Sequence, residues 1–349
     1  MNSNPSFWQR LFSYTHETFK WRQSELDYWH SVVYLVNIGV PALIAWSFGQ
    51  NQLAFVGALG GMIFSLSDSG GTLKARLSNL LIIVGFMLGF GIIGAIVSPH
   101  AVWFWLAFLI SNLCVGWLSV KSHPLLVSAR DGAIALVSVA SLPSPDFSLA
   151  LMLLCSAAVA ACTRVVGHYF FPEAEVVLPK PPEREPLNGW NVPRFCVAYA
   201  LATGAGMILG QARGLSHPAW VVTTILLVMQ PDPRSSFTRI VQRAVGTMLG
   251  VGAAALTIFV LQTQLPIFLA VLFIACLLPH GATRNYSIQS AFIAWLVLVL
   301  YDFAAKAKID PALLTERIGD VLWGCLLAFG ATAVAFFPMF VRKLKTHRS

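Results

Sequence analysis

Three charged residues lie inside otherwise apolar stretches of the sequence: Arg130, Asp131 and Arg164. Charge inside a membrane span is expensive and normally faces a cavity or a partner. At 1.5 Å per residue, Arg130 and Arg164 would each lie about 10 Å from the nearer end of a span. Because Arg130 and Asp131 are adjacent, we expect them on different faces, and we predict an Asp131–Arg164 pair between two helices with Arg130 facing a pathway. A purely structural ion pair is the alternative.

Arg239 and Arg243 are four residues apart, so they share one face of a helix. The sequence places them at the start of an apolar segment, where free N–H groups and the helix dipole already favour anions. Two guanidinium groups there would bind a carboxylate through paired hydrogen bonds, which predicts an anion site. The alternative is that both side chains only anchor the helix end in the lipid headgroups.

Carboxylates at or inside the apolar segments are candidates for a coupling proton. They are Asp131, Asp320 and Asp302. The six cysteines lie in apolar stretches without metal-ligand spacing, and they fit small packing residues. No nucleophile–base arrangement or phosphate loop occurs, so the sequence predicts no metal, no cofactor and no enzymatic activity.

Apolar segments must position these residues, because 57% of the chain is hydrophobic and 11% is charged, against about 45–50% and 25% in soluble domains. An all-α polytopic membrane protein of about twelve transmembrane helices follows. The net charge of +8 comes from basic residues between the apolar runs, as in cytoplasmic anchors, so nucleic acid is not a predicted partner. The predicted spans are 30–49, 52–66, 78–97, 101–120, 124–143, 147–171, 193–210, 217–230, 240–262, 265–280, 286–303 and 315–340.

The domain organisation follows from these segments. It comprises a cytoplasmic interfacial helix at 1–27, a first six-helix repeat at 28–172, a cytoplasmic linker at 173–191, a second six-helix repeat at 192–341, and a basic cytoplasmic tail at 342–349. With the N-terminus inside, seventeen Lys and Arg residues fall on the cytoplasmic side and four on the other. This bias predicts an inner-membrane protein with both termini in the cytoplasm.

Two signals indicate an internal repeat. The run Gly85-Phe-Met-Leu-Gly89 returns as Gly246-Thr-Met-Leu-Gly250 after 161 residues, and Phe-Phe-Pro at 170–172 returns at 336–338 after 166 residues. Six spans in each half predict parallel repeats related by an axis along the membrane normal, with a pathway between them. The glycines are predicted to permit close helix packing.

Two short segments hold corresponding positions in the halves, at 52–66 and 217–230. The first contains Gly57 and Gly61, and the second ends at Pro231-Asp232-Pro233. Paired short or broken spans mark a transporter's binding site. The alternative for Gly57 and Gly61 is helix packing alone.

The second half carries the most specific motif: Trp220, Gln-Pro-Asp-Pro at 230–233, Arg239, Arg243, and Gly-Thr-x-x-Gly at 246–250. This motif resembles the fusaric acid resistance family of bacterial membrane proteins, which includes aromatic acid exporters, and is similar to plant aluminium-activated malate transporters. The resemblance implies efflux of aromatic or other carboxylic acids driven by the proton gradient. The candidate substrate-binding residues are Arg243, Arg239, Arg130, Arg164, Trp220 and Asp232.

The leading functional hypothesis is therefore a proton-coupled exporter of small organic anions. A passive organic-anion channel and a non-transporting scaffold or envelope-assembly protein are the alternatives. Beyond the lipid bilayer and the anion, a second copy of the chain or a periplasmic accessory subunit is left open as a partner.

Overall fold

The computed structural model describes residues 18–19, 28–97, 101–121, 125–142, 145–171, 187, 189–215, 217–306 and 311–346, with side chains to residue 337. Most of the predicted N-terminal helix and linker, and the end of the basic tail, lie outside these residues. The described residues form twelve helices and no strand. The predicted all-α class is confirmed.

The helices follow the apolar segments closely. They are α2 (Tyr28–Ser47), α3 (Asn51–Leu66), α4 (Leu73–Ile96), α5 (Val102–Val120), α6 (Leu126–Ala140), α7 (Phe147–Phe170), α8 (Asn191–Ala212), α9 (Ala219–Val228), α10 (Pro233–Val260), α11 (Gln264–Arg284), α12 (Tyr286–Ala304) and α13 (Ala312–Thr346). Among the described residues, nine of them are long and apolar enough to cross a membrane. The chain is a multi-pass membrane protein.

Five helices differ from the predicted spans. Helices α3, α6 and α9 have 16, 15 and 10 residues, fewer than the roughly 17 residues that a span needs. Helix α10 begins seven residues earlier than predicted, at Pro233, where Asp232 caps it. Arg243 therefore lies about 15 Å inside α10, rather than at its start. Helix α13 continues to Thr346 and includes part of the predicted tail.

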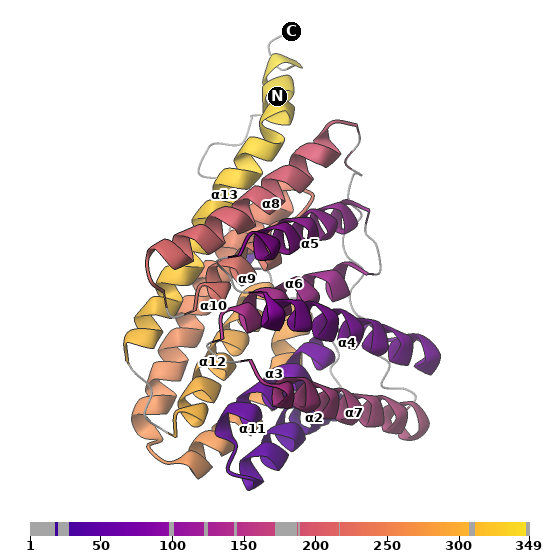
Figure 1. The fold of residues 1–349 in the computed structure, drawn as a ribbon, viewed down its shortest axis with the longest axis vertical. Coiled ribbons are helices and arrows are strands. Elements are labelled where there is room, and N and C mark those ends of the chain that lie inside the picture. The colour runs from indigo at the N-terminus through magenta and orange to yellow at the C-terminus, as the bar shows by residue number, and fades with distance from the viewer. Residues whose placement is uncertain are drawn as a thin grey trace, which may run out of the picture.

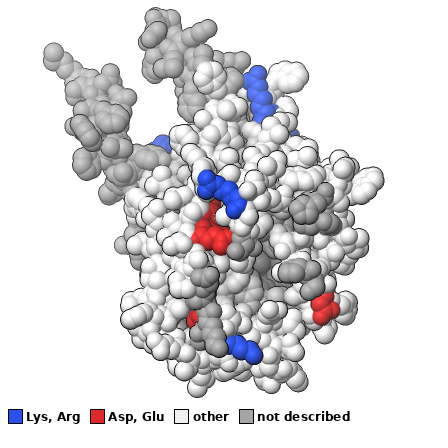
Figure 2. Space-filling view, turned by 60° about the vertical axis from the view of Figure 1, so that its left-hand side comes forward, with Lys and Arg blue, Asp and Glu red and all other residues white. Residues whose placement is uncertain are grey.

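The outer surface is largely uncharged. Figure 2 shows one face on which basic and acidic groups occupy small areas among other residues. Large apolar side chains such as Leu81, Phe259 and Val334 are more than 70% exposed. A surface of this kind is stable against lipid chains but not against water.

Helix pairings in the first six helices recur in the last six. Helix α2 packs on α3 and α7, as α8 packs on α9 and α13; α4 packs on α6 and α7, as α10 packs on α12 and α13. The contacts between the halves match too, since α5 packs on α8 and α11 packs on α2. In Figure 1, α4 and α7 extend to the right while α10 and α13 form the left side. These pairings are the ones that two six-helix repeats would make; the repeat itself stays a prediction.

The buried positions of α4 and α10 show how the two helices correspond. Four buried residues of α10 each lie 163 positions after a buried residue of α4. The pairs are Leu80 with Arg243, Ile83 with Gly246, Val84 with Thr247, and Met87 with Gly250. The offset of 161 that the glycine runs suggested is therefore wrong for packing. It places exposed Gly85 and Gly89 opposite buried Gly246 and Gly250.

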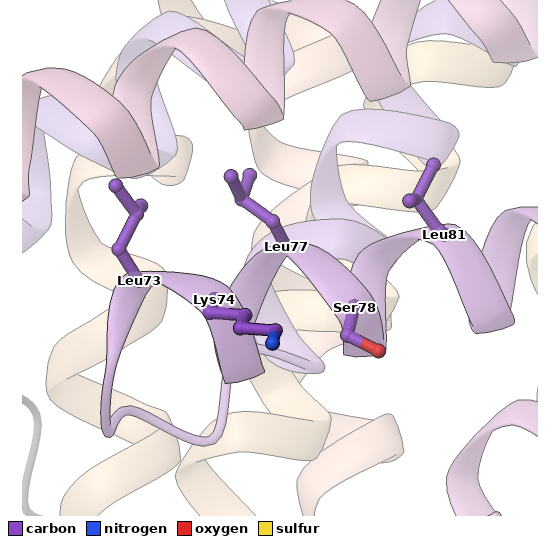
Figure 3. Close-up of a pocket in the computed structure, with 5 residues that line it drawn as sticks. All are labelled: Leu73, Lys74, Leu77, Ser78 and Leu81. Carbon is purple, nitrogen blue, oxygen red and sulfur yellow. The ribbon is translucent and has the colours of Figure 1, made fainter.

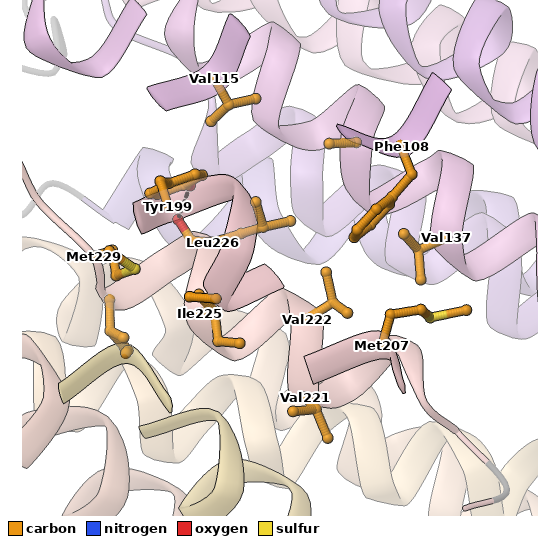
Figure 4. Close-up of a cluster of buried hydrophobic side chains, with 14 of the residues drawn as sticks. Phe108, Val115, Val137, Tyr199, Met207, Val221, Val222, Ile225, Leu226 and Met229 are labelled. Atoms are coloured by element: carbon orange, nitrogen blue, oxygen red, sulfur yellow. Dashed lines mark hydrogen bonds between the residues drawn. The ribbon is translucent and has the colours of Figure 1, made fainter. Parts of the chain in front are cut away.

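Helix α9 is enclosed by apolar side chains of neighbouring helices. Figure 4 shows Val222, Ile225 and Leu226 of α9 among side chains of α5, α6 and α8, including Phe108, Val137 and Tyr199. The Tyr199 hydroxyl donates a hydrogen bond of 3.0 Å to the carbonyl of Leu226. This bond satisfies a carbonyl at the end of α9, which has no following helical turn to bind it.

Candidate functional site

A fully bonded charge cluster lies in the first half, at the ends of α3, α4 and α7. Arg76 donates two hydrogen bonds to the Asp68 carboxylate, at 3.0 and 2.6 Å. Arg164 lies 3.3 Å from the same carboxylate, and its guanidinium also donates to the carbonyls of Arg76 and Phe64. Arg164 is 2% exposed, and none of its nitrogens is among the buried atoms that lack a hydrogen-bond partner in the described residues. This arrangement has the character of a structural ion pair.

The predicted Asp131–Arg164 pair is wrong, because Arg164 pairs with Asp68 instead. Asp131 accepts a hydrogen bond from Ser67 and lies 3.6 Å from Arg130. These adjacent residues thus form an ion pair, although the Nε atom of Arg130 has no hydrogen-bond partner among the described residues. Arg130 therefore does not face a pathway alone.

The second half holds a different set of buried charges. Arg243 is 1% exposed, yet its Nε and Nη1 atoms have no hydrogen-bond partner among the described residues. Three hydroxyls on α10 and α12 are likewise buried and unpartnered within the described chain: Thr247, Ser287 and Ser290. Buried donors are normally bonded, so a group of unused donors indicates a place for an acceptor. An anion is such an acceptor.

Arg317 and Asp320, one turn apart on α13, extend this set. They are 3% and 1% exposed. In the part of the chain that the structure describes, the Nε and Nη1 atoms of Arg317 and both carboxylate oxygens of Asp320 lack a partner. Arg317 lies on α13, which packs against α10, the helix that carries Arg243. The sequence reasoning missed Arg317 as a ligand; two charges one turn apart inside an apolar segment were the available signal.

Aromatic rings cover Arg317. Its guanidinium lies 4.5 Å from the ring centre of Trp220, a cation–π contact. Trp220 stacks on His217 at 4.4 Å and meets the edge of Tyr301 at 5.4 Å. Burial lowers the pKa of His217, in the loop before α9, and this outweighs the charge of nearby Glu316. A neutral imidazole therefore stacks on Trp220 at neutral pH.

Arg239 and Asp232 form hydrogen bonds with the backbone on either side of the break between α9 and α10. The Asp232 carboxylate accepts a 2.7 Å hydrogen bond from the backbone N–H of Ser235 and caps α10. Arg239 donates to the Leu227 carbonyl at 3.4 Å and lies 5.2 Å from the Tyr286 ring centre. Both predicted ligands thus have local structural partners, whereas Arg243, one turn further on, has free donors.

The glycines fall into two groups. A Cβ atom at Gly61, Gly246 or Gly250 would collide with a backbone carbonyl of a neighbouring helix, and one at Gly57 would lie 2.7 Å from Met152. Gly85 and Gly89 are a correction, because a Cβ there would meet nothing within 4 Å. They lie on the outer face of α4, as expected if α4 and α10 correspond at an offset of 163 positions instead of 161.

Two further features remain to be placed. Asp302 is 1% exposed and lies two residues before the end of α12. A hollow on the outside of α4 is lined by Leu73, Lys74, Leu77, Ser78 and Leu81. Figure 3 shows its three leucines pointing one way and Lys74 and Ser78 another. It brings no unpartnered donors together. No metal-binding cluster of His, Cys, Asp or Glu occurs in the described ranges.

Comparison with known proteins finds similarities in the second half of the chain. Residues 204–331 match the model of a family described as fusaric acid resistance protein-like. The chain is 28% identical over 147 residues to the inner membrane protein YccS of Escherichia coli (strain K12), a match that covers 40% of this chain and 19% of that protein.

Two more relatives give similar values. The protein slr1298 of Synechocystis sp. is 28% identical over 157 residues, 44% of this chain and 20% of its own length. The protein YhfK of Escherichia coli (strain K12) is 28% identical over 145 residues, 41% of this chain and 19% of its own length. The chain thus spans about one fifth of each of these relatives. No solved structure matches it significantly.

The matched segment holds Arg243, Trp220, Arg317 and Asp320 together. Residues 204–331 of this multi-pass membrane protein are thus similar to the fusaric acid resistance protein-like family.

Proposed function

We propose that the protein transports small organic anions, aromatic or other carboxylic acids, out of the cell. The observation that carries the proposal is Arg243, a guanidinium that is 1% exposed deep within a membrane helix and has unused donors in the described chain. An unpaired buried charge is costly in a protein, and an anionic ligand removes that cost. The planar guanidinium fork matches a carboxylate.

The scaffold alternative is less well supported. A scaffold needs buried charges only for structure, and such charges are bonded to each other, as Arg164 and Asp68 are. The Nε and Nη1 atoms of Arg243 and Arg317 instead have no hydrogen-bond partner among the described residues. Buried guanidinium donors that are left unused suit the binding of an anion.

Direction and coupling belong to the same proposal. The bias of basic residues favours both termini in the cytoplasm, which places Arg239 nearer the inside and Arg317 nearer the outside. Among the predicted proton carriers, Asp131 is bonded to Ser67 and paired with Arg130, whereas both oxygens of Asp320 are unpartnered within the described residues.

The test is flux of a panel of aromatic and aliphatic acids in proteoliposomes, with the membrane potential clamped and the pH gradient present or absent. We expect carboxylate flux that the pH gradient accelerates. Flux that ignores the gradient would establish the passive channel in place of proton coupling. No flux above that of protein-free liposomes would overturn transport altogether.

Arg243→Gln supplies the residue-level test. Losing a charge-assisted hydrogen bond costs about 1.5–3 kcal/mol, which is roughly a tenfold to more than hundredfold loss of affinity. We expect transport to be abolished while the protein inserts and folds, with partial rescue by Arg243→Lys, because a point charge lacks the fork. The matched control is Arg234→Gln, which removes an exposed charge from the first turn of the same helix. Unaltered transport by Arg243→Gln would reduce this residue to a membrane anchor.

A further inference from the structure

Three buried charges make up what we call the second-half charge cluster: Arg243, Arg317 and Asp320. Each is at most 3% exposed. The groups that act electrostatically on Arg317 are Arg243, Asp320 and the Tyr301 phenol. Those acting on Asp320 are Glu316 and Arg317. Of these groups, Glu316 is half-buried and lies one turn before Asp320, nearer the N-terminal end of α13.

The cluster is not a closed ion pair. The ion pairs within the described chain do not join Asp320 to either arginine. The carboxylate oxygens of Asp320 and two nitrogens of each arginine are all unpartnered in these residues. The aspartate is thus near enough to act on Arg317 through space, and it leaves the guanidinium donors open to a ligand.

Charge arithmetic then restricts the ligand. When Asp320 is ionised, it and the two arginines have a net charge of +1 at a buried position. Glu316 is left out of this sum because it is half-buried and accepts a hydrogen bond from the backbone N–H of His217. One monovalent anion brings the total to zero. A divalent anion brings it to −1, with the second negative charge facing Asp320 and Glu316 at low effective dielectric. A buried uncompensated charge is unfavourable whichever sign it has.

We propose that Asp320 is a built-in counter-ion that restricts the site to monovalent organic anions. This inference rests on the proposed function and deepens it by naming the charge of the substrate. It makes Asp320 a specificity-determining residue. The Asp320 carboxylate supplies the negative charge that a second carboxylate of the substrate would otherwise supply.

The experiment compares two acids that share a benzene ring, benzoate with one carboxylate and terephthalate with two. Calorimetric titration of the purified full-length protein, at one ionic strength and a pH where both acids are ionised, gives the affinity ratio. We expect the unaltered protein to favour benzoate. We expect Asp320→Asn to shift the ratio towards terephthalate by about tenfold or more, because one opposing charge is removed at short range.

Two further variants separate local charge from general effects. Glu316→Gln makes the same change in net charge one turn away, at a half-buried position, and should shift the ratio much less. Arg317→Gln makes the cluster neutral and should abolish benzoate binding. The double variant Arg317→Gln with Asp320→Asn returns it to +1, and should regain benzoate binding through Arg243.

The outcomes are distinct. An unshifted ratio in folded Asp320→Asn, or equal shifts in Asp320→Asn and Glu316→Gln, would overturn the counter-ion role and leave transport intact. Failure of the double variant to regain benzoate, while it folds as the unaltered protein does, would also overturn it. Absence of binding by either acid to the unaltered protein would contradict the proposed function itself.

Discussion

Both halves of the molecule bury an arginine, and the two arginines differ in what their donors do. Arg164 in the first half gives hydrogen bonds to two backbone carbonyls and pairs with Asp68. Arg243 in the second half is as deeply buried, and two of its nitrogens bond to nothing in the described chain. Burial alone therefore does not distinguish a structural arginine from a candidate binding arginine. The two differ in whether their guanidinium donors have hydrogen-bond partners.

Under the predicted repeat, the position that corresponds to Arg243 sharpens the contrast. In the first half it is Leu80, which packs with Phe64, Ile83, Met87 and Ala160 in an apolar cluster. The first half thus has a packed apolar side chain, Leu80, at the position where the second half has the charged Arg243. We infer that the first half supports the second, and that the two do not share one function equally.

The largest effect is expected from breaking the first-half cluster. Arg164→Met leaves the Asp68 carboxylate without one of its partners and frees two carbonyls. Removing one member of a buried ion pair costs about 3–5 kcal/mol. Thermal unfolding in detergent should show this loss, and Lys74→Met, at an exposed position on α4, should show little change. Transport per folded molecule should be retained; a loss of transport without a loss of stability would show that Arg164 binds substrate.

A smaller effect is expected at the glycines. Gly246→Ala would drive a Cβ into the carbonyl of Ser287, and overpacking of this kind costs about 1–3 kcal/mol. Gly85→Ala meets open space, and should be neutral or slightly stabilising, because alanine is the better helix former by up to about 1 kcal/mol. Thermal unfolding of both variants compares the two helices directly. Equal destabilisation would mean that Gly85 also packs against a neighbour, such as a second copy of the chain.

The smallest effect is expected at the helix caps, where the two halves agree. Asp232 caps α10 and Thr72 caps α4, each accepting from a backbone N–H three residues later. Replacement of either by alanine should cost about 0.5–2 kcal/mol. We expect the larger loss at Asp232, since its bond is shorter and charged. The reverse order, measured by unfolding, would show that the capping bond is not the main contribution of Asp232.

The sequence predicts the helices well, because apolar length and turn residues are local properties. It locates α10 less well, since Pro233 and the polar residues after it look like a loop although Asp232 caps a helix there. It also identifies Arg243 as the residue to test. It cannot give partners: whether Arg164 meets Asp68 or Asp131 depends on how α3, α4, α6 and α7 pack. Aligning the two glycine runs gave a wrong register for the same reason. The runs have similar residues, but only the glycines of α10 lie on a buried helix face.

The net charge of the second-half cluster has an electrical consequence for a transporter. One elementary charge that crosses the whole membrane potential changes in energy by about 2.3 kcal/mol per 100 mV. The empty cluster, with two arginines and one ionised aspartate, carries +1 and responds to voltage, while the cluster loaded with a monovalent anion is neutral and does not. An interior-negative potential then pulls the empty site back towards the cytoplasm and leaves the loaded site free to move outwards. Resting voltage alone would drive such a cycle in the direction of export.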